Sequence, residues 1–89
     1  MKVKNMKSPK GNKIANQFII NDGMKEYFQS YKSIIALKDW EKGIIFLDSY
    51  YWNYSNTTGK YRNIFLNETI KETRQKIKSG VYQLTNLNK

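Results

Sequence analysis

Aromatic side chains gather in one short stretch of the chain, YYWNYSNTTGKYRN at residues 50–63. Aromatic rings stack on unpaired nucleic-acid bases, and neighbouring basic side chains then bind the phosphates. The same rings can instead cover a sheet at the corner of a small fold, with their polar tips at its edge. We expect Trp52 to belong to the core. Tyr50 and Tyr51 point in alternating directions, which leaves one of them available for binding.

A basic stripe in the C-terminal third is the second candidate for binding. Lys71, Arg74 and Lys78 share one face of an expected helix, although a solvated helix face is the ordinary role of such a stripe. Arg62 and Arg74 are the only arginines in a lysine-rich chain, and a guanidinium binds phosphate or carboxylate with two parallel hydrogen bonds. The predicted binding residues are Lys60, Arg62, Lys71, Arg74, Lys78, Tyr50 and Tyr51.

Catalytic chemistry has few candidates in this sequence. The chain holds neither cysteine nor histidine, which removes thiolate nucleophiles, zinc–thiolate sites and the usual general base near neutral pH. Asp39 and Glu41 lie in or beside an expected turn, where solvated acids are normal. Gly59 and Lys60 resemble the end of a phosphate-binding loop, but tyrosines occupy two positions where that motif needs Gly and Ser or Thr. We therefore expect a protein that is not an enzyme and uses no cofactor or metal.

The net charge of +9 is unevenly distributed along the chain. Residues 1–13 carry five lysines and no acid, residues 14–59 carry four lysines against five acids, and residues 60–89 carry seven basic residues against two acids. Such a field attracts polyanions, and salt weakens it. Nucleic acid and acidic protein surfaces are thus the expected partners, while a lysine-rich surface without a binding role is the alternative.

The length of 89 residues allows one domain with a single sheet and one or two helices. Residues 1–13 predict a flexible basic N-terminal arm or a loosely held first strand, followed by a single α+β domain over residues 14–89. No run approaches the ~18 apolar residues that span a bilayer, and the N-terminus lacks the apolar segment of an export signal. We expect a cytoplasmic protein without membrane contact.

Two hairpins are expected in the first half of the chain. Asp22-Gly23 between short β-prone runs predicts strands at about 16–21 and 24–30. SIIALKD and IIFLD, with a turn near residues 41–43, predict a second hairpin, for which a short helix at 31–37 is the alternative. Together they form an antiparallel meander of about four strands.

Two helices and an extended end are expected in the second half. Tyr61, Ile64 and Phe65 share one helix face, which predicts a helix at 56–66. A T-x-x-E capping box beginning at Thr69 and a stop at Gly80 predict a helix at 69–79. The final segment VYQLTNL is expected to be extended, with Val81 and Leu84 or Leu87 on the core. The predicted fold is α+β, with a small antiparallel meander, two helices packed on one of its faces and a short extended C-terminus.

The sequence also resembles a family of small phage and prophage proteins of low-GC Gram-positive bacteria. The pattern is N-Q-F, then F-Q-S-Y-x-S-x-I-A, L-D, Y-W-x-Y-S-x-T-T and F-L, closing with K-I-x-x-G-x-Y-x-L. The likeness extends over residues 16–88.

The resemblance implies a protein of a mobile element that acts inside a bacterial host cell. Some phage proteins of this size inhibit CRISPR effectors, so the leading hypothesis is a non-enzymatic anti-CRISPR protein that binds a Cas nuclease or its guide RNA. The alternative is a small basic nucleic-acid-binding or regulatory phage protein. Many CRISPR inhibitors are acidic mimics of nucleic acid, and the charge of +9 departs from that pattern. Either a monomer or a homodimer fits the sequence, because a meander has free edge strands.

Overall fold

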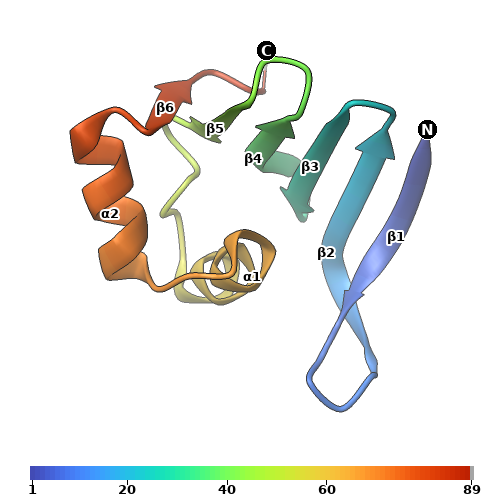
Figure 1. Cartoon of the computed structure of the whole chain (residues 1–89). Coiled ribbons are helices and arrows are strands. Elements are labelled where there is room, and N and C mark those ends of the chain that lie inside the picture. The colour runs from blue at the N-terminus through green and yellow to red at the C-terminus, as the bar shows by residue number, and fades with distance from the viewer. Residues whose placement is uncertain (89) are drawn as a thin grey trace.

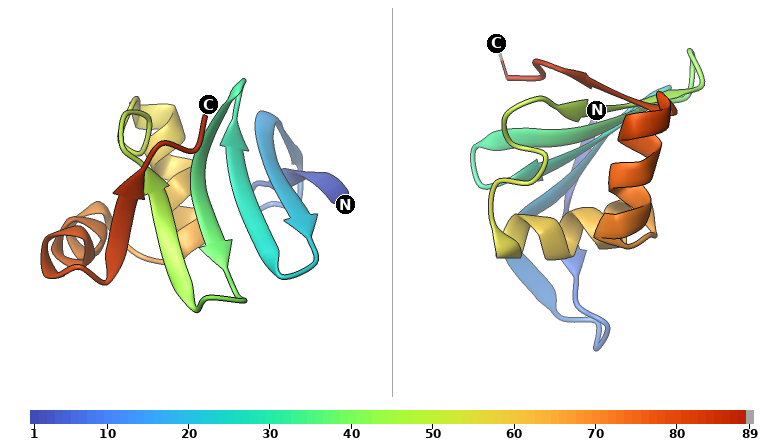
Figure 2. Two further views of the ribbon diagram at one scale, coloured as in Figure 1. Left: turned by 90° about the horizontal axis from the view of Figure 1, so that it is seen from above. Right: turned by 90° about the vertical axis from the view of Figure 1, so that its left-hand side faces the viewer.

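The protein folds into one β-sheet with two helices packed against one of its faces (Figures 1 and 2). The computed structural model describes residues 1–88. The strands are β1 (Lys2–Lys7), β2 (Lys13–Asp22), β3 (Lys25–Ser30), β4 (Ser33–Asp39), β5 (Ile44–Asp48) and β6 (Tyr82–Thr85). The helices are α1 (Asn56–Leu66) and α2 (Ile70–Ser79), which lie between β5 and β6 in the chain. The α+β class predicted from the sequence is confirmed.

The strands lie in the sheet in the order of the sequence. The first five pair antiparallel, and the turns between β2 and β3 and between β4 and β5 contain Gly23 and Gly43 with φ angles of 66° and 67°. A positive φ is readily adopted by glycine, which makes these short turns possible. Both predicted hairpins are confirmed. The alternative of a helix at 31–37 is wrong, because residues 33–39 form β4.

The prediction of about four strands is too low, since β1 and β6 extend the sheet at its two edges. Three of the six residues of β1 are lysines, and the strand buries only Met6. β6 pairs with β5 in parallel, which requires a crossover through α1 and α2 that local patterns do not reveal. Of the first 13 residues, Lys2–Lys7 form the edge strand β1.

The bounds of α1 are those predicted, and α2 begins one residue later than predicted, because Thr69 is its N-cap. The hydroxyl of Ser55 accepts a hydrogen bond from the Thr58 amide at the start of α1, and Asn67 ends this helix in the left-handed conformation. Thr69 and Glu72 form the capping box of α2, in which each side chain accepts from the backbone N–H of the other.

Neither helix within residues 1–88 is long and apolar enough to cross a membrane.

The core lies between the sheet and the helices. Phe28 and Leu47 are fully buried on the sheet, and the ring of Phe28 lies 5.8 Å from that of Phe65 on α1. Tyr61 also packs into this cluster, whereas Ile64 at its margin is 45% exposed. Trp52 packs against the cluster as a partly buried side chain, which confirms its predicted place in the core.

The C-terminal residues form hydrogen bonds to the first residues of β4. The side-chain amide of Asn88 donates to the carbonyl of Ile34 at 2.8 Å, and its oxygen accepts from the N–H of Ile34 at 2.6 Å. These two hydrogen bonds satisfy the backbone of β4 beyond the end of β5. The predicted burial of Val81 is wrong, because this side chain is exposed. Of the two alternatives Leu84 and Leu87, Leu84 is exposed and Leu87 is half-buried. Tyr82 is the residue of this segment that enters the core, since its position in β6 faces the helices.

Candidate functional site

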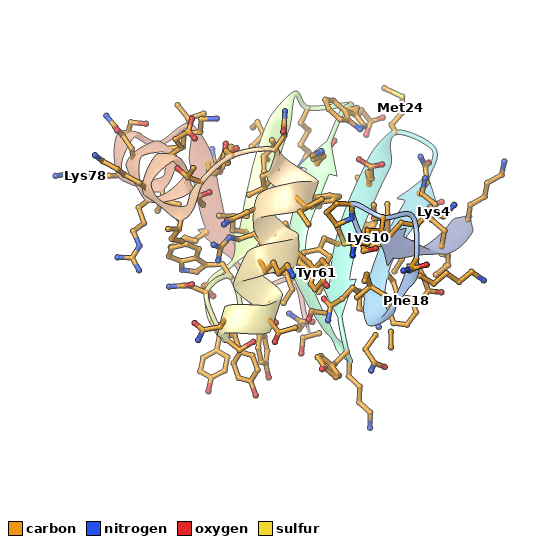
Figure 3. The ribbon with its side chains drawn as sticks, turned by 90° about the horizontal axis from the view of Figure 1, so that it is seen from below. Lys4, Lys10, Phe18, Met24, Tyr61 and Lys78 are labelled. Carbon is orange, nitrogen blue, oxygen red and sulfur yellow. The ribbon has the colours of Figure 1, made fainter. Side chains whose placement is uncertain are left out.

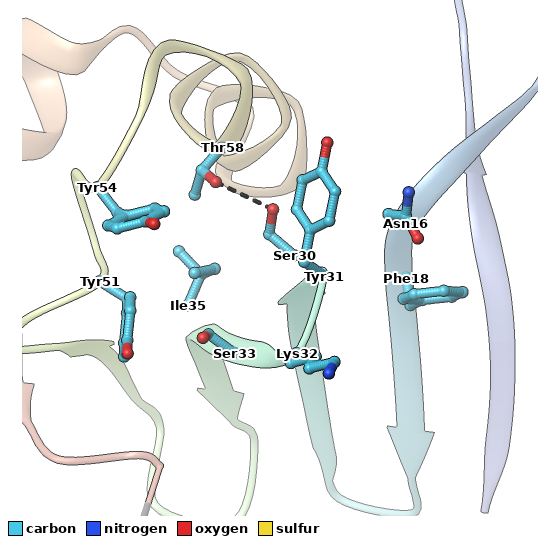
Figure 4. A pocket seen from close by; sticks show the side chains of 10 residues that line it. All are labelled: Asn16, Phe18, Ser30, Tyr31, Lys32, Ser33, Ile35, Tyr51, Tyr54 and Thr58. Carbon is cyan, nitrogen blue, oxygen red and sulfur yellow. Dashed lines mark hydrogen bonds between the residues drawn. The ribbon is translucent and has the colours of Figure 1, made fainter.

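A pocket of about 700 Å³ opens at one end of the sheet, between β2, the β3–β4 turn and the segment that leads into α1 (Figure 4). Aromatic rings make up much of its wall: Phe18, Tyr31, Tyr51 and Tyr54. Small-molecule sites occupy roughly 300–1,000 Å³ and are largely apolar with a few polar groups, so the pocket is of the right size and composition for a ligand.

Two residues of the pocket have left-handed backbone conformations that are unusual outside glycine. Asn16 has a φ of 64° and Tyr31 a φ of 56°, and the N–H of Tyr31 donates to the carbonyl of Asn16 at 2.7 Å. The side chain of Gln29 also donates to the Tyr31 carbonyl at 2.7 Å. Such conformations cost about 1–3 kcal/mol each and are found most often at functional sites. The fold holds Tyr31 at the pocket despite this cost.

The floor of the pocket is polar on one side. The hydroxyls of Ser30 and Thr58 lie 3.0 Å apart and share a hydrogen bond (dashed in Figure 4). Because each hydroxyl can donate once and accept twice, the pair retains one donor and free acceptors for a ligand. Gln17 is the register partner of Ser30 and is buried, and its amide atoms have no partner within residues 1–88.

The buried carboxylate of Asp48 shapes the segment that carries the tyrosines. Its Oδ2 accepts from the backbone N–H of Tyr50 at 3.1 Å and of Tyr51 at 2.7 Å, and its Oδ1 accepts from Leu87 at 2.8 Å. Burial raises the pKa of Asp48, but these bonds and the side chain of Asn88 outweigh burial, so the pKa is lower than usual. The carboxylate therefore stays charged and holds the turn that follows β5.

Three tyrosines stack edge to face along this segment. The ring of Tyr51 lies 4.7 Å from that of Tyr50 and 5.3 Å from that of Tyr54, at steep interplanar angles of 85° and 67°. Tyr51 is half-buried and lines the pocket, whereas Tyr50 is 73% exposed and lies outside the lining. Of the two tyrosines predicted to bind, the structure brings Tyr51 into the pocket and leaves Tyr50 as its outer neighbour.

We expect Asp48→Ala to lower the free energy of unfolding by about 2 kcal/mol, because three backbone N–H groups lose a charged acceptor. Urea denaturation followed by circular dichroism measures this loss. Asp22→Ala, which changes an exposed aspartate at the end of β2, is the matched control and should change stability by less than about 0.5 kcal/mol. Equal stability of the two variants would contradict the role of Asp48.

The structure corrects the prediction for Arg62, which is 1% exposed and so does not belong to a surface stripe. Its Nη1 donates to the carbonyl of Trp52 at 2.7 Å and to Asn53 Oδ1 at 3.2 Å, and its Nη2 donates to Asn63 Oδ1 at 2.9 Å. The guanidinium also lies 5.4 Å from the centre of the Trp52 ring. Arg62 therefore ties the tyrosine-bearing segment to α1. The sequence could not show this, because the helix turns position 62 toward the sheet.

Burial lowers the pKa of Arg62, and the nearby charge of Arg74 lowers it further, whereas the charge of Glu68 opposes both. Its hydrogen bonds go to neutral oxygen atoms, and its Nε has no partner within residues 1–88. A buried charge of this kind is costly when one of its partners is removed. Arg62 thus positions the pocket rather than contacting a partner.

The other predicted basic residues are exposed on the helices and lie outside the pocket. These are Lys60 on α1, and Lys71, Arg74 and Lys78 on α2. Lysines lie on both sides of α1, with Lys78 on one side and Lys4 and Lys10 on the other (Figure 3). Lys32 is the one cation among the described residues that line the pocket.

The prediction omitted Tyr54 and Thr58, which line the pocket from the segment before α1 and from its first turn, and it omitted the pocket residues of β2 and the β3–β4 turn. Tyr31 and Lys32 form a two-residue link between strands, and Asn16 and Phe18 face it from β2. The only local signal was a polar, aromatic link between two β-prone runs.

Of the two carboxylates considered for catalysis, Asp39 has a structural role. Asp39 is buried and its Oδ1 accepts from the Lys42 N–H at 3.0 Å, which shapes the β4–β5 turn.

The fold and the site define a small α+β protein with an aromatic pocket of ligand size and a strongly basic exterior. Residues 1–80 match the model of a protein family of unknown function, DUF8033. The chain therefore belongs to that family. Nothing among the curated proteins matches the chain. No solved structure matches it either.

The stretches that carry the sequence resemblance meet at the pocket. N-Q-F contributes from β2, F-Q-S-Y-x-S-x-I-A contributes the β3–β4 turn, and Y-W-x-Y-S-x-T-T contributes the segment before α1 and its first turn.

Proposed function

We propose that this protein is a non-enzymatic protein that binds single-stranded nucleic acid, with one unpaired base held in the aromatic pocket. The observation that carries the proposal is the grouping of Tyr31, Tyr51 and Tyr54 around a pocket with a polar floor. Base stacking on an aromatic side chain contributes about 1–3 kcal/mol and tolerates any sequence.

The chemistry of the pocket fits a nucleobase better than an aliphatic ligand. A base presents flat faces for the rings of Tyr31 and Tyr54, which are 55% and 62% exposed and so are accessible. Its edge presents donors and acceptors to the hydroxyls of Ser30 and Thr58. A purely apolar ligand would leave the remaining hydroxyl donor of this pair without an acceptor.

The charge of the protein supplies attraction for the phosphates. Lys32 lies at the pocket, and the N-terminus of α1 begins beside it with no acidic residue in its first turn. Helix N-termini attract anions, and the net charge of +9 adds a long-range field. Affinity should therefore fall as the salt concentration rises.

The test is fluorescence anisotropy with short labelled RNA and DNA strands of mixed sequence. Tyr54→Ala should weaken binding about tenfold, because one stacking surface is lost. Trp40→Ala is the matched control: Trp40 is 57% exposed, close to the 62% of Tyr54, but it follows β4 at the other end of the sheet. Equal losses for the two variants, or binding that ignores salt, would contradict the proposal.

A second candidate function is inhibition of a host nuclease defence, such as a CRISPR effector, by contact with its guide RNA or an acidic protein face. The observation that favours it is the exposed stripe of Lys71, Arg74 and Lys78, which lies outside the pocket. Pull-down of the tagged protein from the lysate of a CRISPR-bearing host, with and without nuclease, separates the two. A defence protein that survives digestion supports the inhibitor, and partners lost on digestion support the nucleic-acid-binding protein.

A further inference from the structure

A groove runs along the helix side of β1 and β2, beside α1. It consists of two hollows of about 400 and 310 Å³ that share Lys4 and Ile19 in their walls. One hollow extends to Lys2, and the other lies between β1 and Ile64 of α1. None of the described residues that line the groove also lines the aromatic pocket, so the groove is a separate feature of the surface.

Strand register places lysine side chains over this groove. Lys2 pairs with Asn21 and Lys4 with Ile19, and Ile19 packs against the core on the helix side of the sheet. Cross-strand partners point to the same face, so Lys2 and Lys4 project toward the groove. Both are exposed, and Figure 3 shows Lys4 to one side of α1. Lys7 is a third exposed lysine in the lining.

The wall formed by α1 adds apolar surface and a further positive charge. Ile64 is 45% exposed, and the exposed Lys60 lies one turn earlier on the same face of the helix. Glu26 is the one acid among the described residues that line the groove, and its carboxylate already has a partner in Lys38 Nζ at 3.8 Å. The groove therefore carries an excess of positive charge and complements a chain of negative groups.

The aromatic pocket and the groove lie along the same two elements. β2 contributes Asn16 to the pocket and Ile19 to the groove, and α1 contributes Thr58 and Ile64 in the same way. Six helical residues separate Thr58 from Ile64, which is about 9 Å along the helix axis. Alternate residues of β1 lie about 6.6 Å apart, close to the distance between successive phosphates of an extended strand. One nucleic-acid strand can thus reach from the pocket into the groove, whereas an acidic protein segment has no group for the aromatic pocket.

We propose that the groove between α1 and the β1–β2 hairpin binds the phosphates of the nucleic-acid strand whose base is held in the pocket, an inference that rests on the proposed function. Lys2, Lys4 and Lys7 neutralise successive phosphates, and Ile19 and Ile64 contact the sugars between them.

Fluorescence anisotropy with a labelled thymidine dinucleotide and an octanucleotide, each over a range of salt concentrations, tests the proposal. The wild type should bind the octanucleotide more tightly, because the dinucleotide fills only the pocket. The double variant Lys2→Gln, Lys4→Gln should lower the slope of log affinity against log salt for the octanucleotide by about 1.4, since each phosphate contact on a single strand contributes about 0.7. Its affinity for the dinucleotide should not change.

The matched control is the double variant Lys71→Gln, Lys78→Gln, which removes the same charge from exposed positions of α2 outside the groove. It should keep the wild-type slope, and circular dichroism verifies that both variants fold. An equal loss of slope in the two double variants would overturn the proposal, and so would an octanucleotide that binds no more tightly than the dinucleotide.

The remaining outcomes separate the groove from the pocket. Binding that Tyr54→Ala weakens but that keeps its full salt slope in Lys2→Gln, Lys4→Gln would overturn the groove and leave the proposed function standing. A wild type that binds neither oligonucleotide would overturn both. A hexaglutamate peptide that binds as tightly as the octanucleotide, and is lost in the same double variant, would assign the groove to an acidic protein segment and overturn the proposal.

Discussion

Arg62→Ala is expected to lower the free energy of unfolding by about 3 kcal/mol, a large part of the stability of so small a domain. The substitution leaves the Trp52 carbonyl and the side chains of Asn53 and Asn63 without their donor, and it opens a cavity beneath the Trp52 ring. The segment that carries Tyr51 and Tyr54 should then lose its attachment to α1. Urea denaturation measures the loss of stability, and limited proteolysis within residues 50–55 reports the loosened segment.

Arg74→Ala is the matched control for Arg62→Ala, because the chain has two arginines and one is exposed on α2. It should change stability by less than about 0.5 kcal/mol. If Arg62→Ala were as stable as the wild type, the buried position of the guanidinium would be wrong, and Arg62 would return to the predicted surface stripe.

Glu68→Gln is expected to lower the free energy of unfolding by about 2 kcal/mol near neutral pH. The Glu68 side chain is 3% exposed, and its carboxylate accepts from Lys76 Nζ at 2.6 Å, from the Tyr82 hydroxyl at 2.7 Å and from Thr73 Oγ1 at 2.5 Å. Through these hydrogen bonds, Glu68 connects the segment between α1 and α2 both to α2 and to β6. Glutamine lacks the charge and directs an amide N–H₂ at groups that are themselves donors.

The same carboxylate gives the protein a defined response to acid. Burial raises the pKa of Glu68, but the hydrogen bonds from Lys76, Thr73 and Tyr82 outweigh burial and bring it below its ordinary value of 4.5. A carboxyl with a lowered pKa stabilises the fold fully above its unfolded pKa, and this contribution is lost as the pH falls through the folded value.

Stability should therefore decline as the pH drops below about 4.5, and less steeply in Glu68→Gln than in the wild type. Denaturation curves over this pH range measure both slopes. Glu41→Gln, an exposed residue of the β4–β5 turn, is the control and should follow the wild type. An unchanged acid slope in Glu68→Gln would show that this carboxylate does not carry the stabilisation.

Local signals in the sequence predicted the elements whose cause is local. The Asp22-Gly23 turn, the capping box that starts at Thr69 and the stop at Gly80 each act within a few residues, and the structure contains all three. The two edge strands could not be predicted from local patterns, for a physical reason. β6 exists because a crossover of two helices returns the chain to β5, and β1 because a lysine-rich segment pairs with β2, so both depend on distant pairing.

The candidate site was predictable only in part. The aromatic stretch pointed to Tyr51, and exposed rings were expected there. Tyr31 and Asn16 join it only because the β3–β4 turn folds back onto β2, where the Tyr31 N–H meets the Asn16 carbonyl. Arg62 is the opposite case. An arginine in a basic stretch predicted a surface contact, but the orientation of α1 buries this side chain.

Photocrosslinking of a short strand that contains iodouridine, with the crosslinked peptides identified by mass spectrometry, tests the central claim most directly. The account predicts crosslinks to Tyr31 or Tyr54, and their loss in the matching alanine variants while crosslinking by Trp40→Ala is kept. Crosslinks confined to Trp40 or to residues of α2, with none at the pocket, would contradict a base held by the tyrosines.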